Sequence, residues 1–147
     1  MKIYLSLIII LFSFACTEFK KEQSGYIESK TETKNQDPLT KSMELGAGVY
    51  QNFCVQCHLT SGKGVPNNFP PLAGSNWLTE KRTESIYAVK FGQKGEIVVN
   101  GITYDGIMTP MGLSDEEVAN VLNYVMNSWG NKQDKLVTKA EVTAVEK

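Results

Sequence analysis

Apolar residues recur with helical spacing in residues 42–54, which predicts an amphipathic helix near the start of a folded domain. Gly46 stands four positions before Tyr50 and therefore on the same helical face. A glycine inside a helix costs about 1 kcal/mol relative to alanine. We therefore expect a second helix to cross closely over Gly46.

The pattern predicts that second helix near the end of the domain, from Ser114 to about Trp129. Ser114 is a suitable N-cap, and Glu117 three positions later completes a capping box. Apolar residues then continue with helical spacing until Gly130 ends the pattern. We expect this helix to pack on the first one.

Shorter elements are predicted between the two helices. Glycines and prolines in residues 62–71 indicate a loop, and residues 83–91 have the pattern of a short helix. The β-favouring residues 97–99 and 102–104 flank Asn100-Gly101, a pair typical of a two-residue type I′ turn. We expect a small hairpin in a fold that is otherwise helical.

The first residues of the chain have the pattern of an export signal. An apolar run over residues 3–14 is shorter than the roughly 20 residues that a membrane-spanning helix needs. It ends at Ala15-Cys16, which resembles the lipobox of bacterial lipoproteins. We expect a signal peptide at 1–15 and a lipid on Cys16; the alternative is an ordinary signal peptide followed by an incidental cysteine.

Composition divides the rest of the chain. Residues 16–41 are charged and polar, which favours a flexible linker behind the lipid-bearing cysteine, and residues 131–147 are similarly polar and are expected to form a disordered tail. A single domain is left at 42–130. The formal net charge is −1, and no basic stripe favours a nucleic-acid partner.

The candidate chemistry lies in the segment Cys54-Val55-Gln56-Cys57-His58. Two thiols followed directly by an imidazole are typical of a covalent attachment site for haem c, in which both thiols bond to the porphyrin edge and the imidazole binds iron. A structural zinc site needs four ligands, and Cys16 is the only cysteine outside this segment. A thioredoxin-like pair has no use for the histidine, and a disulfide across so short a loop would be strained.

His58 is the only histidine in the chain, so a second axial ligand from the protein must be another residue type, with methionine the leading candidate. Further motifs surround the attachment segment. They are Gly62-Lys63-Gly64-Val65-Pro66, Phe69-Pro70-Pro71-Leu72-Ala73-Gly74-Ser75, Tyr104-Asp105-Gly106-Ile107-Met108 and Asn127-Ser128-Trp129-Gly130. With these motifs the chain resembles the class I cytochrome c family, specifically the small bacterial mono-haem type. The resemblance implies an all-α cytochrome c fold with crossing N- and C-terminal helices around a covalently bound haem.

The resemblance also implies roles for individual residues. Cys54 and Cys57 become the thioether anchors. His58 becomes the proximal iron ligand, oriented by the carbonyl of Pro70, with Pro71 as the alternative. Met108 becomes the distal ligand, and Met111 competes with it because it has the same chemistry.

Two more side chains are candidates for the haem pocket. Trp77 and Tyr104 each combine an apolar ring with one polar group and could reach a haem propionate, although ordinary core packing explains them equally well.

An iron with both axial positions occupied by protein leaves no place for a substrate, so we expect an electron carrier and not an enzyme. Its expected partners are a quinol-oxidising complex and a terminal oxidase or reductase. Its expected location is the periplasmic side of a bacterial membrane. Two alternatives stay open. One is a fixed subunit of a dehydrogenase, oxidase or reductase; the other is a haem sensor or peroxidase with a labile methionine ligand.

Overall fold

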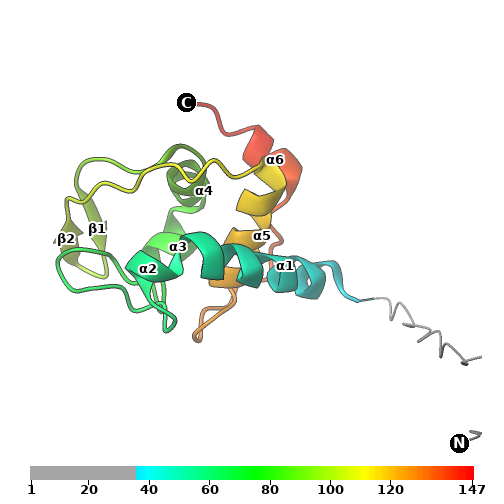
Figure 1. The fold of residues 1–147 in the computed structure, drawn as a ribbon, viewed down its shortest axis with the longest axis horizontal. Helices are drawn as coiled ribbons and strands as arrows, with labels where there is room; N and C mark the ends of the chain where they lie inside the picture. Colours follow the sequence, from blue (N-terminus) through cyan, green and yellow to red (C-terminus); the bar gives the residue numbers. More distant parts are fainter. Residues whose placement is uncertain (1–35) are drawn as a thin grey trace, which may run out of the picture. The chain divides into compact units, whose positions relative to one another are not determined.

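The computed structural model describes residues 36–147, so the predicted signal peptide, Cys16 and most of the predicted linker lie outside the described residues. The described part is mostly helical with one small antiparallel sheet, as predicted (Figure 1). None of its helices is both long and apolar enough to cross a membrane. The elements are α1 (Pro38–Phe53), α2 (Val55–His58), α3 (Asn76–Glu80), α4 (Arg82–Phe91), β1 (Ile97–Val99), β2 (Ile102–Tyr104), α5 (Asp115–Val125) and α6 (Lys139–Thr143).

The helix α1 begins earlier than the apolar pattern indicates. Asp37 is its N-cap and accepts a hydrogen bond from the backbone N–H of Thr40 at 3.2 Å, and Pro38 occupies the first helical position. Proline suits this position because the N–H that it lacks would have no intrahelical partner there. The predicted boundary between a linker at 16–41 and a domain at 42–130 is therefore wrong at this end, because residues 38–41 are helical.

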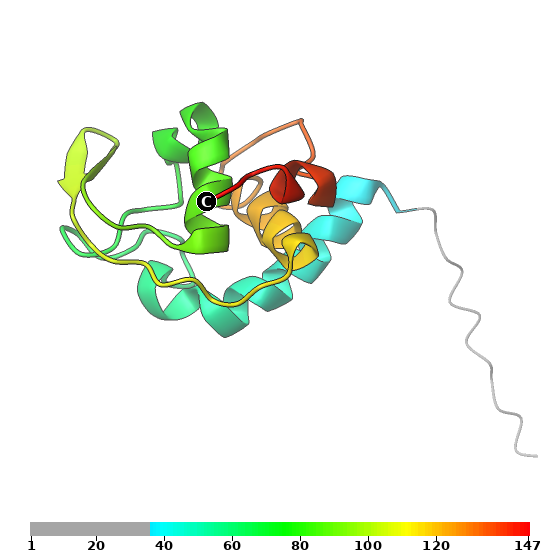
Figure 2. The ribbon, with the colours of Figure 1, turned by 90° about the horizontal axis from the view of Figure 1, so that it is seen from above.

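The predicted close crossing at Gly46 is confirmed. The helices α1 and α5 cross, and a Cβ atom added at Gly46 would lie only 2.0 Å from the backbone oxygen of Asn120 (Figure 2). The capping box of α5 is also present: the hydroxyl of Ser114 accepts from the N–H of Glu117, and Glu117 accepts from the N–H of Ser114 at 2.8 Å. This helix ends at Val125, a few residues before the predicted end.

The predicted disordered tail is wrong for residues 131–147. This segment folds back on the domain and forms α6, with Val137 and Val142 fully buried. The amide side chain of the buried Asn123 donates to the carbonyl of Val137 at 2.9 Å and accepts from its N–H at 2.8 Å. Two well-spaced valines and this long-range pairing order a segment whose composition is otherwise polar.

The predicted hairpin is confirmed. In the antiparallel pairing Ile97 faces Tyr104 and Val99 faces Ile102, and both turn residues have positive φ angles (Asn100 +52°, Gly101 +79°), as a type I′ turn requires. Asn76 and Asn100 exchange two hydrogen bonds. The backbone N–H of Asn76 donates to the side-chain oxygen of Asn100 at 2.9 Å, and the backbone N–H of Asn100 donates to the side-chain oxygen of Asn76 at 2.8 Å. The turn of the hairpin is thereby held against α3.

Candidate functional site

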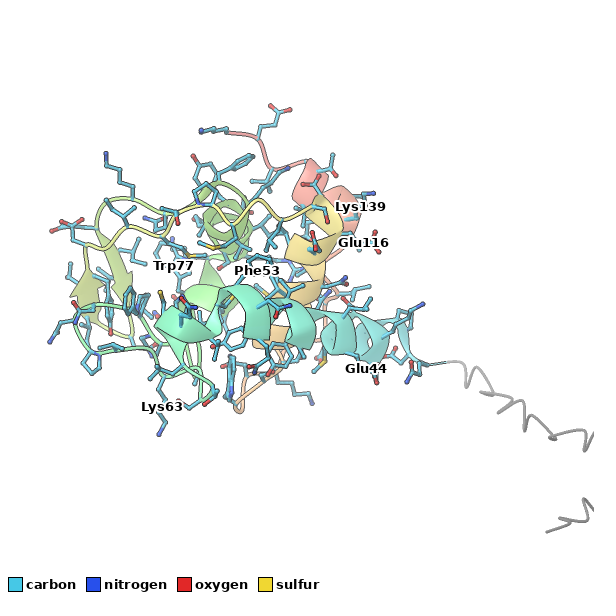
Figure 3. The ribbon with its side chains drawn as sticks, viewed as in Figure 1. Glu44, Phe53, Lys63, Trp77, Glu116 and Lys139 are labelled. Atoms are coloured by element: carbon cyan, nitrogen blue, oxygen red, sulfur yellow. The ribbon has the colours of Figure 1, made fainter. Side chains whose placement is uncertain are left out.

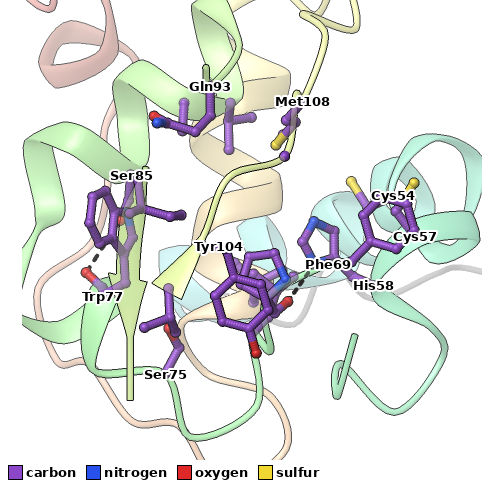
Figure 4. Close-up of a pocket in the computed structure, with 18 of the residues that line it drawn as sticks. Cys54, Cys57, His58, Phe69, Ser75, Trp77, Ser85, Gln93, Tyr104 and Met108 are labelled. Carbon is purple, nitrogen blue, oxygen red and sulfur yellow. Dashed lines mark hydrogen bonds between the residues drawn. The ribbon is translucent and has the colours of Figure 1, made fainter. Parts of the chain in front are cut away.

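A single apolar cavity brings the predicted site residues together (Figure 4). Its walls come from α2, α3, α4, α5, the hairpin and the segments 68–75 and 106–111. Most of its lining surface is apolar, with aliphatic side chains that include Leu72, Leu78, Val89, Val99, Leu122 and Val125. By contrast, charged side chains such as Glu44 and Lys63 project outward from the fold (Figure 3).

Cys54 and Cys57 lie on one wall of this cavity as half-buried free thiols. Cys54 lies between α1 and α2, as the C-cap of the first helix and the N-cap of the second, so the junction of the two helices positions both sulfur atoms. Burial, with a smaller contribution from Cys57, raises the pKa of Cys54 to about 11. Both thiols thus face an apolar space, as attachment to an apolar ring requires.

His58 ends α2, and its ring is fixed by a backbone carbonyl. Its Nδ1 lies 3.1 Å from the carbonyl oxygen of Pro70. Because a carbonyl can only accept, Nδ1 carries the proton and Nε2 keeps the lone pair that binds a metal. Burial lowers the pKa of His58, while the bond to Pro70 opposes this shift. Among the described residues Pro70, and not Pro71, makes this contact.

A tight loop brings Pro70 to His58. The N–H of Gly64 donates to the carbonyl of His58 at 3.0 Å, and Gly64 has a φ of +62°. A Cβ atom at Gly64 would lie 2.6 Å from the carbonyl oxygen of Pro70. Glycine is therefore required here both for the backbone conformation and for the close approach of the two segments.

Met108 and Met111 both line the cavity. Figure 4 shows Met108 on a different segment of the cavity wall from Cys54 and Cys57. Met108 is the more firmly held of the two. Its backbone exchanges two hydrogen bonds with Gln93, at 2.8 and 2.9 Å. Within the described residues Met111 makes no such backbone pair.

Trp77 and Tyr104 also line the cavity, and Tyr104 is buried. Within the described part of the chain, no buried polar side-chain atom lacks a hydrogen-bond partner, so the indole N–H and the phenol O–H, which donate to no protein group in this part, reach solvent. Both polar groups can therefore donate to a bound acceptor.

The cavity lining also includes three polar residues that were not predicted as site residues, Ser75, Ser85 and Gln93. The hydroxyl of Ser85 donates to the carbonyl of Lys81 at 2.7 Å, and the amide of Gln93 donates to the carbonyl of Lys94 at 3.3 Å. No local pattern marks Ser85, because which face of α4 turns inward depends on how α3, α4 and α5 pack.

These residues fit a haem. A flat apolar group needs an apolar cavity, two thiols at one edge, an imidazole with a free Nε2 and a soft ligand opposite. The cavity contains each of these features: Cys54 and Cys57, His58 oriented by Pro70, and a methionine across from them.

Comparison with known proteins agrees with this geometry. Residues 43–129 match the family described as cytochrome c. Cytochrome c-552 of Thermus thermophilus is 40% identical over 91 residues, which are 58% of this chain and 69% of that protein. The cytochrome c subunit of a quinone alcohol dehydrogenase from Gluconobacter oxydans is 34% identical over 101 residues, or 66% of this chain and 21% of that subunit. Subunit CcoP of a cbb3-type cytochrome c oxidase from Rhodobacter capsulatus is 29% identical over 108 residues, or 69% of this chain and 35% of that subunit.

Proposed function

The chain belongs to the class I cytochrome c family, whose cofactor is covalently bound haem c, and we propose that it carries single electrons between redox proteins. The observation that supports this function best is the placement of His58 and Met108 around one apolar cavity. In this proposal both axial ligands come from the protein. No position on the iron is then left for a substrate, and the chain is a carrier and not an enzyme.

Each residue has a defined part in this function. Bound haem c supplies an iron that changes oxidation state by one electron. Cys54 and Cys57 hold its edge through thioether bonds, and His58 binds the iron through Nε2 while Pro70 fixes the imidazole. Met108 would supply a thioether sulfur as the second iron ligand. The apolar lining would exclude water from the iron.

Replacement of one methionine at a time tests the distal ligand. In Met108→Leu, with Met111 retained, we expect the methionine–iron charge-transfer band of the ferric holoprotein to disappear and the reduction potential to fall, because a soft ligand that favours ferrous iron is lost. The matched variant Met111→Leu should keep the band. The reverse result would assign the ligand to Met111. Carbon monoxide binding to the resting ferrous protein would instead favour a sensor or peroxidase.

We further propose that Trp77 and Tyr104 donate hydrogen bonds to a haem propionate. Their free polar groups and their position in the cavity wall support this role. Tyr104→Phe removes one donor and keeps the ring, so it should change the reduction potential and its dependence on pH while haem attachment stays complete. An unchanged potential across the pH range would leave Tyr104 as a packing residue.

We propose that the protein works outside the cytoplasm, on the periplasmic side of a bacterial membrane, with a signal peptide at 1–15 and a lipid on Cys16. The sequence pattern supports this location, and these residues lie outside the described part of the structure. A lipid anchor would place the domain near a quinol-oxidising complex and a terminal oxidase or reductase, its proposed partners. Cys16→Ser should release the haem protein from washed membranes; retention in the membrane fraction would contradict the anchor.

A second candidate function is that of a fixed subunit in a larger redox complex. The names of two relatives, a quinone alcohol dehydrogenase subunit and a cbb3-type oxidase subunit, favour it. Purification from detergent-solubilised membranes distinguishes the two functions. A fixed subunit elutes with partner proteins at constant stoichiometry, whereas a mobile carrier separates from them when the salt concentration rises.

A further inference from the structure

Lys90, near the end of α4, joins three helices. Its ammonium group lies 3.2 Å from a carboxylate oxygen of Asp115, in the first turn of α5. It also donates to the carbonyls of Val142 and Val145 at 2.9 and 3.2 Å, at the end of α6. The side chain is only 17% exposed, so these three acceptors replace most of its water.

The two residues that follow α4 hold Met108. Gln93 exchanges two backbone hydrogen bonds with Met108, and a Cβ atom at Gly92 would lie 2.5 Å from the Met108 oxygen. Residues 105–113 join β2 to α5. Within the described structure, the two bonds between Met108 and Gln93 are the only backbone–backbone hydrogen bonds that this segment makes. The backbone of Met108 is therefore positioned by the end of α4.

We propose that Lys90 is a positioning residue for Met108: it fixes the end of α4 against α5 and α6, and Gly92 and Gln93 transmit that position to the ligand. The inference rests on the proposed function, because it assumes that Met108 binds the haem iron. It adds that the C-terminal segment 131–147 contributes to the strength of the iron–methionine bond, through the carbonyls of Val142 and Val145 that Lys90 binds.

The effect of Lys90 on Met108 depends on the contacts that a replacement of Lys90 would remove. Asp115 and two carbonyl groups would lose a charged donor, and the last turn of α4 would lose its attachment to both neighbouring helices. Gly92 and Gln93 would then move more freely, and Met108 with them. A thioether is a weak, uncharged ligand, so a small loss of positioning lets an added ligand compete with it.

Two control variants separate this role from charge and from general stability. Lys81→Met removes the same charge at the start of α4, where Lys81 is 51% exposed and pairs only with Glu84 at 4.0 Å. Arg82→Met loosens the tail at the other end of α4, because Arg82 binds Glu141 through two nitrogens at 2.6 and 2.8 Å. Neither residue is adjacent to Gly92.

The experiment measures imidazole binding to the ferric holoprotein at neutral pH, well below the unfolding temperature, together with the methionine–iron charge-transfer band. For Lys90→Met we expect about a tenfold gain in imidazole affinity and a weaker band, the size typical of lost support for a metal ligand. Lys81→Met should bind imidazole as the unmodified protein does, and Arg82→Met, which loosens the tail but keeps Lys90, should gain much less affinity than Lys90→Met. Lys90→Arg, which keeps the charge, should restore most of the band.

Each other outcome is informative. If the unmodified protein lacks the band, methionine ligation and the proposed function fail together. If it has the band and Lys90→Met binds imidazole no more tightly, the positioning role is wrong while the electron carrier stands. An equal gain in Arg82→Met would also overturn the role, since general loosening of the tail would then suffice. Should Lys90→Met yield no holoprotein, Asp115→Asn replaces it: a smaller gain supports the role, and no gain contradicts it.

Discussion

Two halves of the domain bury their apolar residues in different ways. The helical half, residues 38–53 and 114–147, contains Tyr50, Val118, Leu122 and Val142, each with no exposed surface. Large apolar side chains are exposed at two positions of this half, Leu45 and Phe53, but at five positions of the loop half, residues 59–75 and 93–113; these are Leu59, Phe69, Val98, Ile102 and Ile107. The helical half packs against itself and against Leu78 and Ile86 of α3 and α4, whereas the loop half lines a cavity. We therefore expect a bound haem to form the core of the loop half.

Loss of haem attachment should produce the largest difference in stability between the two halves. In Cys54→Ser with Cys57→Ser no thioether bond can form, and the cavity loses the group around which the loop half packs. We expect backbone amides of residues 59–75 and 93–113 to lose protection from hydrogen exchange, while those of α1 and α5 retain part of theirs. Complete loss of protection in both halves would show that the helical half is not stable by itself.

A clash at the crossing of α1 and α5 should test the helical half. Gly46→Ala places a Cβ atom 2.0 Å from the Asn120 oxygen, so we expect the free energy of unfolding to fall by about 1–3 kcal/mol or more. Gly48→Ala is the matched control on the same helix, because nothing lies within 4 Å of its added Cβ. That variant should gain up to about 1 kcal/mol. Denaturant unfolding of the holoproteins measures both; similar values would contradict the close crossing.

Removal of one helix cap should have a smaller effect that is confined to the helical half. Ser114→Ala deletes the hydroxyl that accepts from Glu117 and should lower the free energy of unfolding by about 1 kcal/mol. The visible spectrum of the haem should not change, because Ser114 does not line the cavity. A shifted spectrum would show that the start of α5 also positions the loop half.

The smallest expected effect concerns pH. The hydrogen bond and charge of Arg82 hold the pKa of Glu141 below its usual value of 4.5. Protonation is therefore easier in the unfolded chain, and the pair stabilises the tail above pH 4.5 and loses this contribution as the pH falls toward the lowered value. Glu141→Gln should weaken the decrease in stability over that acidic range, as measured by thermal unfolding at several pH values. An unchanged pH dependence would mean that the pair contributes nothing measurable.

Much of the fold follows from local signals. The capping box at Ser114, the turn at Asn100-Gly101 and the glycine at position 46 each act over a few residues, and all three are confirmed. The early start of α1 also had a local signal, the pair Asp37-Pro38, which the apolar pattern alone did not include. The tail was predicted wrongly because its order depends on Asn123 and α4, which are distant in sequence.

Some features of the candidate site also follow from local sequence, whereas others depend on contacts between distant segments. By itself the sequence determined the attachment segment from Cys54 to His58 and two possible methionine ligands, because the chemistry of haem c requires particular residues in a particular order. Only the tertiary structure decided which residues line the cavity, that Pro70 and not Pro71 contacts His58, and that Met108 is held by Gln93. These relations join segments far apart in the chain. Packing and long-range hydrogen bonds create them, and a local pattern carries no information about either.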